Sequence, residues 1–183
     1  MIKKYEIVPE KSFSVIRNCS GCGRKAAFIN TKKFRVNANG NRIDVWLIYQ
    51  CEQCKHTFNL TIYERKNPTL IPNEEYEQFL CNDEALAKEY GKKIQFFRSN
   101  KAEVNYQSVP YCFSLIKEDT HDGTLPRQCY YEIQNPYGLK IRREKQIAEV
   151  LGVSRSNVKS LIEQGKLVIG EVTPFYLSFT VKD

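Results

Sequence analysis

The sequence of 183 residues lacks any long hydrophobic run, and its longest uninterrupted apolar stretch has five residues, Val45 to Tyr49. A membrane-spanning helix requires about 20 consecutive apolar residues, and a signal peptide requires an apolar stretch of about 7 to 15 residues near the N-terminus. The N-terminal sequence MIKKYEIVPEKSF offers no such stretch. We therefore expect a protein of the cytoplasm that has no membrane partner.

Residues suited to catalysis are scarce as well. The two histidines are His56 and His121, and the sequence identifies an acid–base partner for neither. No glycine-rich phosphate loop occurs, and the isolated cysteines Cys81, Cys112 and Cys129 lie in mostly apolar company, which predicts burial rather than reactivity. Because acid–base and nucleophilic catalysis need a positioned pair of titratable groups, we expect a binding protein and not an enzyme.

Positive charge, in contrast, is in excess. The chain carries 28 Lys and Arg residues against 21 Asp and Glu residues, a formal net charge of +7. The excess lies at both ends: residues 1–64 carry 11 positive and 5 negative side chains, and residues 139–183 carry 8 and 5. Nucleic acid is the commonest anionic partner of such a chain. A basic surface that is merely solvated explains the charge equally well.

Four of the seven cysteines form a pattern. Cys19 with Cys22, and Cys51 with Cys54, are two CxxC pairs separated by 28 residues. In a reducing compartment such pairs are typical metal ligands, and four thiolates favour one structural zinc ion with tetrahedral coordination and no open position. A core of this size supplies only about 3 to 5 kcal/mol, so we expect the metal to decide whether the segment folds.

Glycine supplies the freedom that a tight CxxC turn needs. Gly21 and Gly23 lie in the first turn, where a residue without Cβ adopts positive φ at little cost. Lys55 stands in the second turn where Gly23 stands in the first, which makes the second turn less favourable. We interpret the neighbouring His56 as a surface histidine or a support for the ligands, because four thiolates already complete the site.

Between and after the two cysteine pairs, the sequence predicts three antiparallel strands. Residues 33–37 and 42–50 flank Asn39-Gly40, the strongest short hairpin signal, and residues 57–64 form the third strand. We therefore predict a zinc ribbon over residues 1–64. The hairpin tip is rich in cations and amides that could contact phosphates or bases, or could simply be soluble; these residues are Lys32, Lys33, Arg35, Asn37, Asn39, Asn41 and Arg42.

The strand over residues 43–49 is apolar on both faces, so another element must cover this sheet. Apolar residues recur at helical spacing over residues 73–98, after Pro72, and Asn82-Asp83 interrupts the pattern. We expect the segment 65–100 to be helical and to pack on the ribbon sheet.

The run KFRVNANGNRIDVWLIYQCEQCKHTFNLTIYERKNP resembles a bacterial family known as domain of unknown function 1062. The resemblance covers residues 15–95 well and the rest of the chain more loosely. It implies that the two cysteine pairs and the Asn-rich hairpin belong together, and it implies no activity.

The second informative stretch is residues 140–166, KIRREKQIAEVLGVSRSNVKSLIEQGK, which predicts two helices around a turn. Gly152 is placed to end the first helix in the left-handed conformation, Ser154 is a ready N-cap for the second helix, and Gly165 ends the second helix. Strands are expected over residues 104–108, 111–117 and 128–133 before the helices, and over residues 166–169 and 175–181 after them.

The string LGVSRSNVKSLIEQGKLV is similar to two kinds of domain. It resembles the small RNA-binding domain first described in ribosomal protein S four, although Ile169-Gly170 appears in place of the Asn-Gly of that pattern and one position early. It also resembles the winged helix-turn-helix DNA binders, in which residues 155–162 would be the recognition helix. Either reading uses the same cations and one amide suited to a base edge, namely Lys140, Arg142, Arg143, Arg155, Asn157, Lys159 and Lys166.

The sequence thus predicts an α+β protein with a zinc ribbon and its three-stranded antiparallel sheet (1–64), a helical middle segment (65–100) and a small C-terminal α/β domain resembling RNA-binding domains (101–183). The favoured function is a zinc-containing protein, monomeric, that binds structured RNA. The alternatives are a helix-turn-helix DNA-binding regulator and a protein-interaction module without a nucleic-acid ligand.

Overall fold

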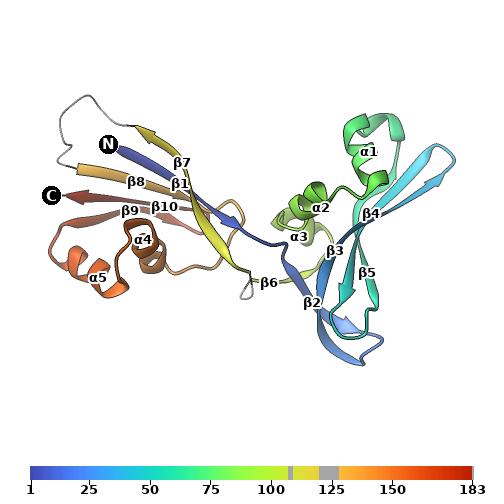
Figure 1. Cartoon of the computed structure of the whole chain (residues 1–183), viewed down its shortest axis with the longest axis horizontal. Helices are drawn as coiled ribbons and strands as arrows, with labels where there is room; N and C mark the ends of the chain where they lie inside the picture. Colours follow the sequence, from blue (N-terminus) through green and yellow to red (C-terminus); the bar gives the residue numbers. More distant parts are fainter. Residues whose placement is uncertain (107–108, 120–127, 183) are drawn as a thin grey trace. The chain divides into compact units, whose positions relative to one another are not determined.

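The computed structural model describes residues 1–106, 109–119 and 128–182; His121 lies outside these residues. The chain divides into two compact units (Figure 1). Unit 1 combines Met1–Glu10 with Tyr111–Asp183, and unit 2 consists of Lys11–Pro110. Unit 2 is therefore inserted between the first strand of unit 1 and the rest of it.

Unit 2 contains a five-stranded antiparallel sheet in the order β5-β4-β3-β2-β6. The strands are β2 (Ser14–Cys19), β3 (Arg24–Asn39), β4 (Arg42–Cys51), β5 (Thr57–Lys66) and β6 (Glu103–Asn105). The predicted Asn39-Gly40 hairpin joins β3 to β4, and Gly40 has the positive φ of 59° that the turn requires.

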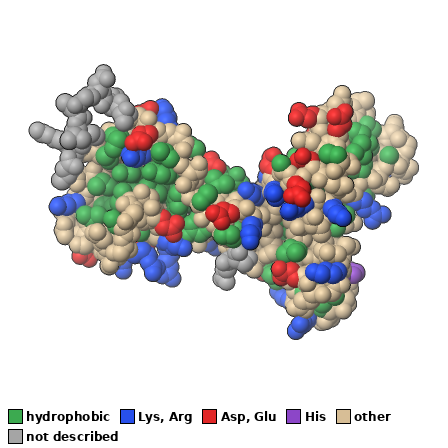
Figure 2. Space-filling model, in the orientation of Figure 1, with side chains coloured by type: hydrophobic (Ala, Val, Ile, Leu, Met, Phe, Trp, Pro, Cys, Tyr) green, Lys and Arg blue, Asp and Glu red, His purple; other side chains and the backbone are tan. Residues whose placement is uncertain are grey.

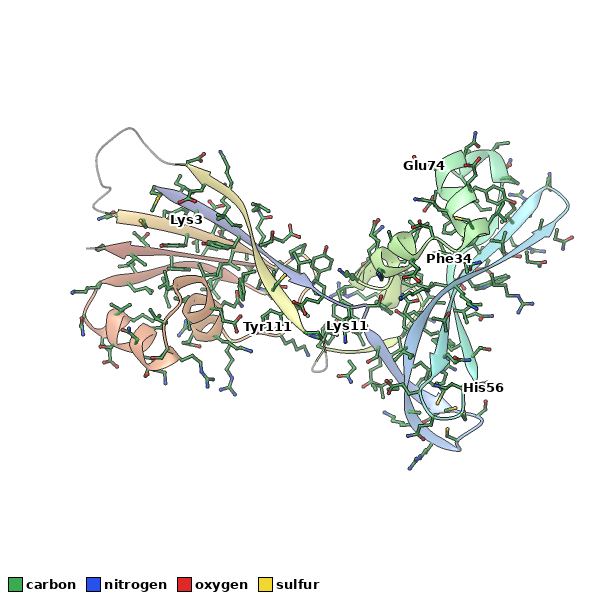
Figure 3. The ribbon with its side chains drawn as sticks, viewed as in Figure 1. Lys3, Lys11, Phe34, His56, Glu74 and Tyr111 are labelled. Carbon is green, nitrogen blue, oxygen red and sulfur yellow. The ribbon has the colours of Figure 1, made fainter. Side chains whose placement is uncertain are left out.

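One face of this sheet carries the core of unit 2. Side chains of β4 alternate between buried and half-buried, as expected for a strand with one covered face. The covering elements are the short 3-10 turn Pro68–Leu70 and the helices α1 (Asn73–Cys81), α2 (Glu84–Tyr90) and α3 (Ile94–Ser99). The ring of Phe79 in α1 lies 4.9 Å from that of Phe34, and Phe97 in α3 lies 6.0 Å from Tyr49 (Figure 3 labels Phe34).

Unit 1 contains a second five-stranded sheet, in the order β7-β1-β8-β10-β9. The strands are β1 (Ile2–Pro9), β7 (Tyr111–Asp119), β8 (Gln128–Gln134), β9 (Leu167–Thr173) and β10 (Tyr176–Lys182). Strand β1 pairs antiparallel with β7 and parallel with β8, where Tyr5 lies opposite Ile133. The N-terminal residues therefore occupy the interior of a sheet built otherwise from the C-terminal part of the chain.

Two helices, α4 (Arg143–Leu151) and α5 (Arg155–Glu163), accompany this sheet. The predicted boundaries between them are present: Gly152 is left-handed at the end of α4, and the Ser154 side chain caps α5 by accepting from the Asn157 N–H. Ile147 of α4 and Val158 of α5 are fully buried. Among the described residues, no helix is long and apolar enough to cross a bilayer.

The predicted fold class, an α+β protein with a three-stranded ribbon sheet, a helical middle segment and a small C-terminal α/β domain, is wrong. The structure is mostly β and consists of two large sheets of five strands each. The ribbon strand β3 pairs further with β2, which in turn pairs with β6, and the C-terminal strand β8 pairs with β1. These pairings join distant segments, which local sequence patterns do not reveal.

The isolated cysteines also differ from the prediction of burial. Cys81 and Cys112 are exposed, and Cys129 is half-buried. Cys81 lies at the end of α1, and Cys112 lies on β7, an edge strand of its sheet. Apolar neighbours in the sequence therefore did not indicate a buried position, because an edge strand exposes part of its apolar sequence.

Candidate functional site

The four paired cysteines lie on two turns at one end of the unit 2 sheet. Cys19 and Cys22 lie on the turn between β2 and β3, and Cys51 and Cys54 on the turn between β4 and β5. Strand pairing brings the turns together, because Phe28 of β3 lies opposite Cys51 of β4. Figure 3 shows the sulfur atoms beside His56.

The sulfur atoms have the spacing of a tetrahedral metal site. All four Sγ atoms lie within 4.8 Å of one another; Cys19 and Cys54 are 3.3 Å apart, and Cys22 and Cys51 are 3.8 Å apart. Zinc–sulfur bonds of about 2.3 Å in a tetrahedron place the sulfurs about 3.8 Å apart. The four cysteines could therefore hold one metal ion, with all four positions filled by protein.

The two turns have the same backbone path. The Gly23 N–H donates to the Cys19 carbonyl at 2.9 Å, and the Lys55 N–H donates to the Cys51 carbonyl at 3.1 Å. Gly23 has a φ of 65° and Lys55 a φ of 64°. Lys55 therefore adopts the left-handed conformation that the sequence assigned to glycine, at the conformational cost that a Cβ adds.

Gly21 is required for a different reason from the one the sequence suggested. Its φ is not among the positive values of the chain. A Cβ atom at Gly21 would lie 2.8 Å from the Cys54 sulfur. This glycine leaves room for a ligand of the opposite turn, whereas the positive φ belongs to Gly23.

Hydrogen bonds from the turns favour a thiolate at part of the site. Backbone N–H groups of Cys54 and Gln53 point at the Cys51 sulfur and lower the pKa of this thiol to about 7. The opposite holds for Cys22, where contact with the Cys54 sulfur and burial raise the thiol pKa to about 12. A bound cation would favour the thiolate form at all four cysteines, because each thiolate would then face a positive charge.

Polar side chains join the two turns around the sulfurs. Ser20 Oγ lies 2.9 Å from His56 Nε2, and Arg24 Nη2 donates to Gln53 Oε1 at 2.9 Å. His56 is exposed, and its ring contacts Ser20 of the first cysteine turn. This placement agrees with its interpretation as a surface histidine that supports the ligands.

A second feature is a basic groove, defined here as the open cavity of about 610 Å³ in unit 1 at the first turns of α4 and α5. Its lining consists of Arg142, Glu144, Ser154, Arg155, Ser156 and Lys159. Three cations thus face one carboxylate, and Figure 2 shows Lys and Arg side chains gathered beside these helices. Hydrogen bonding to Arg143 lowers the pKa of Glu144, and the positive charge of Lys159 adds to this effect.

Only part of the predicted cation set lines this groove. Arg142, Arg155 and Lys159 do so. The other predicted residues are exposed elsewhere on the surface of unit 1, namely Lys140, Arg143, Asn157 and Lys166. Arg143 donates to Glu144 at 2.8 Å. Sequence reasoning missed the two serine hydroxyls in the groove, although the N-cap role of Ser154 was recognisable from its position before a helical pattern.

The fold and the site together define a two-sheet protein with four clustered cysteines that could hold a metal ion in one unit and a basic helical groove in the other. The family described as "Protein of unknown function (DUF1062)" matches residues 36–172, well over half of the chain, and the chain belongs to this family. No curated protein and no solved structure matches the chain.

Proposed function

We propose that this chain is a zinc-stabilised nucleic-acid-binding protein whose basic groove in unit 1 contacts structured RNA. The observation that carries the proposal is the convergence of Arg142, Arg155 and Lys159 on one open cavity. Arg142 is the N-cap residue of α4, the other two cations belong to α5, and the turn at Gly152 brings the two helices together.

Zinc is the metal that the site favours. Four thiolates in a closed tetrahedron are the commonest ligand set of structural zinc. The ion contributes about 10 to 16 kcal/mol of apparent binding free energy at neutral pH in small peptides. Zinc would therefore hold the ends of β2–β5 in place, and with no open position it would have no catalytic role.

Phosphate is the group that the groove suits. The first N–H groups of a helix lack partners within the helix and attract anions. At α5 the N–H of Asn157 is used by Ser154, while Arg155 and Ser156 belong to the lining of the groove. Arg142 and Lys159 add charge on either side, and the Ser154 and Ser156 hydroxyls add short polar contacts.

Structured RNA is favoured over duplex DNA because the groove offers shallow contacts. An A-form helix presents a wide minor groove lined with 2′-hydroxyls, which serine hydroxyls and backbone groups can reach. A DNA-reading helix would instead insert the outer side chains of α5 into the major groove. Here α5 supplies only part of the groove, because Arg142 at the start of α4 lines it as well. The binding surface is therefore a cleft between two helices and not a single projecting helix.

The test is a titration of an RNA hairpin and of a DNA duplex of equal charge at two salt concentrations. If four to six phosphates are neutralised, log affinity for RNA should fall with log salt at a slope of roughly −3 to −5. The double variant Arg155→Gln with Lys159→Gln should bind more weakly, and its slope should be shallower by about one to two units.

The matched control is Lys117→Gln with Lys182→Gln, which removes the same charge from exposed positions on β7 and β10. This control should keep the slope of the unaltered protein. Tighter and sequence-dependent binding of the DNA duplex would replace the proposal with the helix-turn-helix reading. Absence of binding to either ligand would leave the groove as part of a protein-interaction surface.

A further inference from the structure

The sheet of unit 2 has one face that α1–α3 do not cover. Along β4 the side chains of Trp46 and Ile48 point away from the buried row of Val45 and Leu47, and both are half-buried. Figure 1 shows these helices beside the sheet. The helical cover therefore accounts for only one of the two apolar faces of β4.

The flanking strands supply this open face with two different kinds of side chain. On β3, Arg35 lies opposite Trp46 and Lys33 lies opposite Ile48. On β5, Thr61 lies opposite Trp46 and Asn59 lies opposite Ile48. Residues directly opposite on neighbouring strands share a face. We call these six residues the open face, namely Lys33, Arg35, Trp46, Ile48, Asn59 and Thr61.

The cations of the open face are held beside its aromatic ring. The Arg35 guanidinium lies 5.8 Å from the centre of the Trp46 ring, and Lys33 and Arg35 are both exposed. The neighbouring Lys32 is different, because it lies in an irregularity of β3 and pairs with Glu84 of α2 at 2.9 Å. Of the four cations of the hairpin tip, Lys32 is thus tied to the helices, Arg42 donates to the Arg65 carbonyl at 3.3 Å, and the other two lie on the open face.

We infer that the open face binds single-stranded nucleic acid, with a base stacked on Trp46 and phosphates on Lys33 and Arg35. Aromatic side chains stack on every base, and cations along one side follow the backbone. Asn59 and Thr61, on the other side of the ring, offer neutral hydrogen-bonding groups to base edges. One strand thus supplies charge, the next the stacking surface, and the third the polar contacts.

Charge favours a nucleic acid over an apolar partner. On β4, Asp44 continues the alternation of Trp46 and Ile48, and its Oδ1 accepts from the Arg65 N–H of β5 at 2.8 Å. Two exposed cations beside a half-buried ring would lose their hydration against an apolar protein surface. Phosphates compensate that loss, and the ring then covers a base.

The inference shares its ligand class with the proposed function but uses other residues in another unit, so the two can fail separately. The chain has one tryptophan, so selective tryptophan fluorescence reports on Trp46 alone. The zinc-loaded full-length protein is titrated with an unstructured oligouridylate of about 12 nucleotides. Stacking should quench the fluorescence in a saturable way, and the dependence on salt should reflect the two phosphate contacts, with a log–log slope of about −1.4.

Affinity is measured in parallel with a labelled oligonucleotide, so that variants without tryptophan can be compared. Trp46→Ala should weaken binding by about 5- to 150-fold, and Trp46→Phe should retain most of the affinity because it keeps a ring. Lys33→Gln with Arg35→Gln should weaken binding and remove most of the salt dependence. The matched control is Lys88→Gln with Arg98→Gln, which removes the same charge from exposed positions on α2 and α3.

The groove variant Arg155→Gln with Lys159→Gln should leave the quenching of Trp46 unchanged, whatever it does to binding of hairpin RNA. Unchanged Trp46 fluorescence at saturating oligonucleotide would overturn the inference. Equal loss of affinity in the control and in the Lys33 and Arg35 variant would overturn it as well, since it would reduce binding to net charge. A fluorescence change that depends on protein concentration without oligonucleotide would assign the face to a second copy of the chain instead.

Discussion

Replacing Gly21 by alanine tests the geometry of the metal site at a single atom. The added Cβ would lie 2.8 Å from the Cys54 sulfur, whereas non-bonded contacts of this kind are favourable at about 3.5 to 4.0 Å. Cys54 would have to move by about 0.7 Å or more, while metal–ligand distances tolerate about 0.2 Å. We expect metal affinity to fall at least about 100-fold, equivalent to about 2.7 kcal/mol.

Gly23→Ala is the matched control, because it adds the same methyl group to the same turn. Apart from its two chain neighbours, no atom in the described part of the chain lies within 4 Å of a Cβ at Gly23, so the positive φ is what opposes the change, at about 1 to 2 kcal/mol. That cost concerns the backbone conformation of the turn and does not displace a metal ligand. Lys55 already adopts the same conformation in the other turn.

Competition with a chromophoric chelator measures the metal affinities of both variants. Equal affinity of Gly21→Ala and the unaltered protein would refute the geometry.

Three further predictions concern the metal and the two cores. Metal analysis of protein purified without added zinc should give close to one zinc per chain, and Cys51→Ser should lose both the metal and the fold of unit 2; a folded metal-free variant or stoichiometric iron would contradict this. Tyr49→Phe should destabilise unit 2 by about 1 to 3 kcal/mol in urea unfolding, because it leaves the buried Phe13 carbonyl without the Tyr49 hydroxyl. Asn135→Ala should destabilise unit 1 by about 3 kcal/mol in the same assay, because this buried side chain bonds to the backbone of Leu139 twice and of Pro174 once; an unchanged unfolding midpoint would contradict either prediction.

The features that the sequence predicted are those encoded over a few residues. The CxxC spacing predicted the grouping of the four cysteines, and Asn39-Gly40 predicted the hairpin between β3 and β4. Gly152 and Ser154 predicted where α4 ends and α5 begins. In each case one residue type satisfies a local requirement for conformation, capping or ligation, so its position in the sequence is informative.

The features that the sequence did not predict depend on contacts between distant segments. Strand β1 has only a partial alternation of polar and apolar residues, and its partners β7 and β8 lie more than a hundred positions further along the chain. The space requirement at Gly21 arises from Cys54 of the other turn. The basic groove needs Arg142 and Lys159 to meet across a turn, which charge counting alone does not show.

Because unit 2 is inserted between β1 and β7, the two units cannot fold in the order in which their first residues are synthesised. Unit 2 is continuous in sequence, so during synthesis it can fold as soon as it has emerged. Residues 2–9 are made before unit 2 but must wait for β7 and β8 before they pair with a strand on either side. A segment made before the insert thus acquires its partners only after the insert is complete, and the folded insert shortens the distance that this late pairing must close.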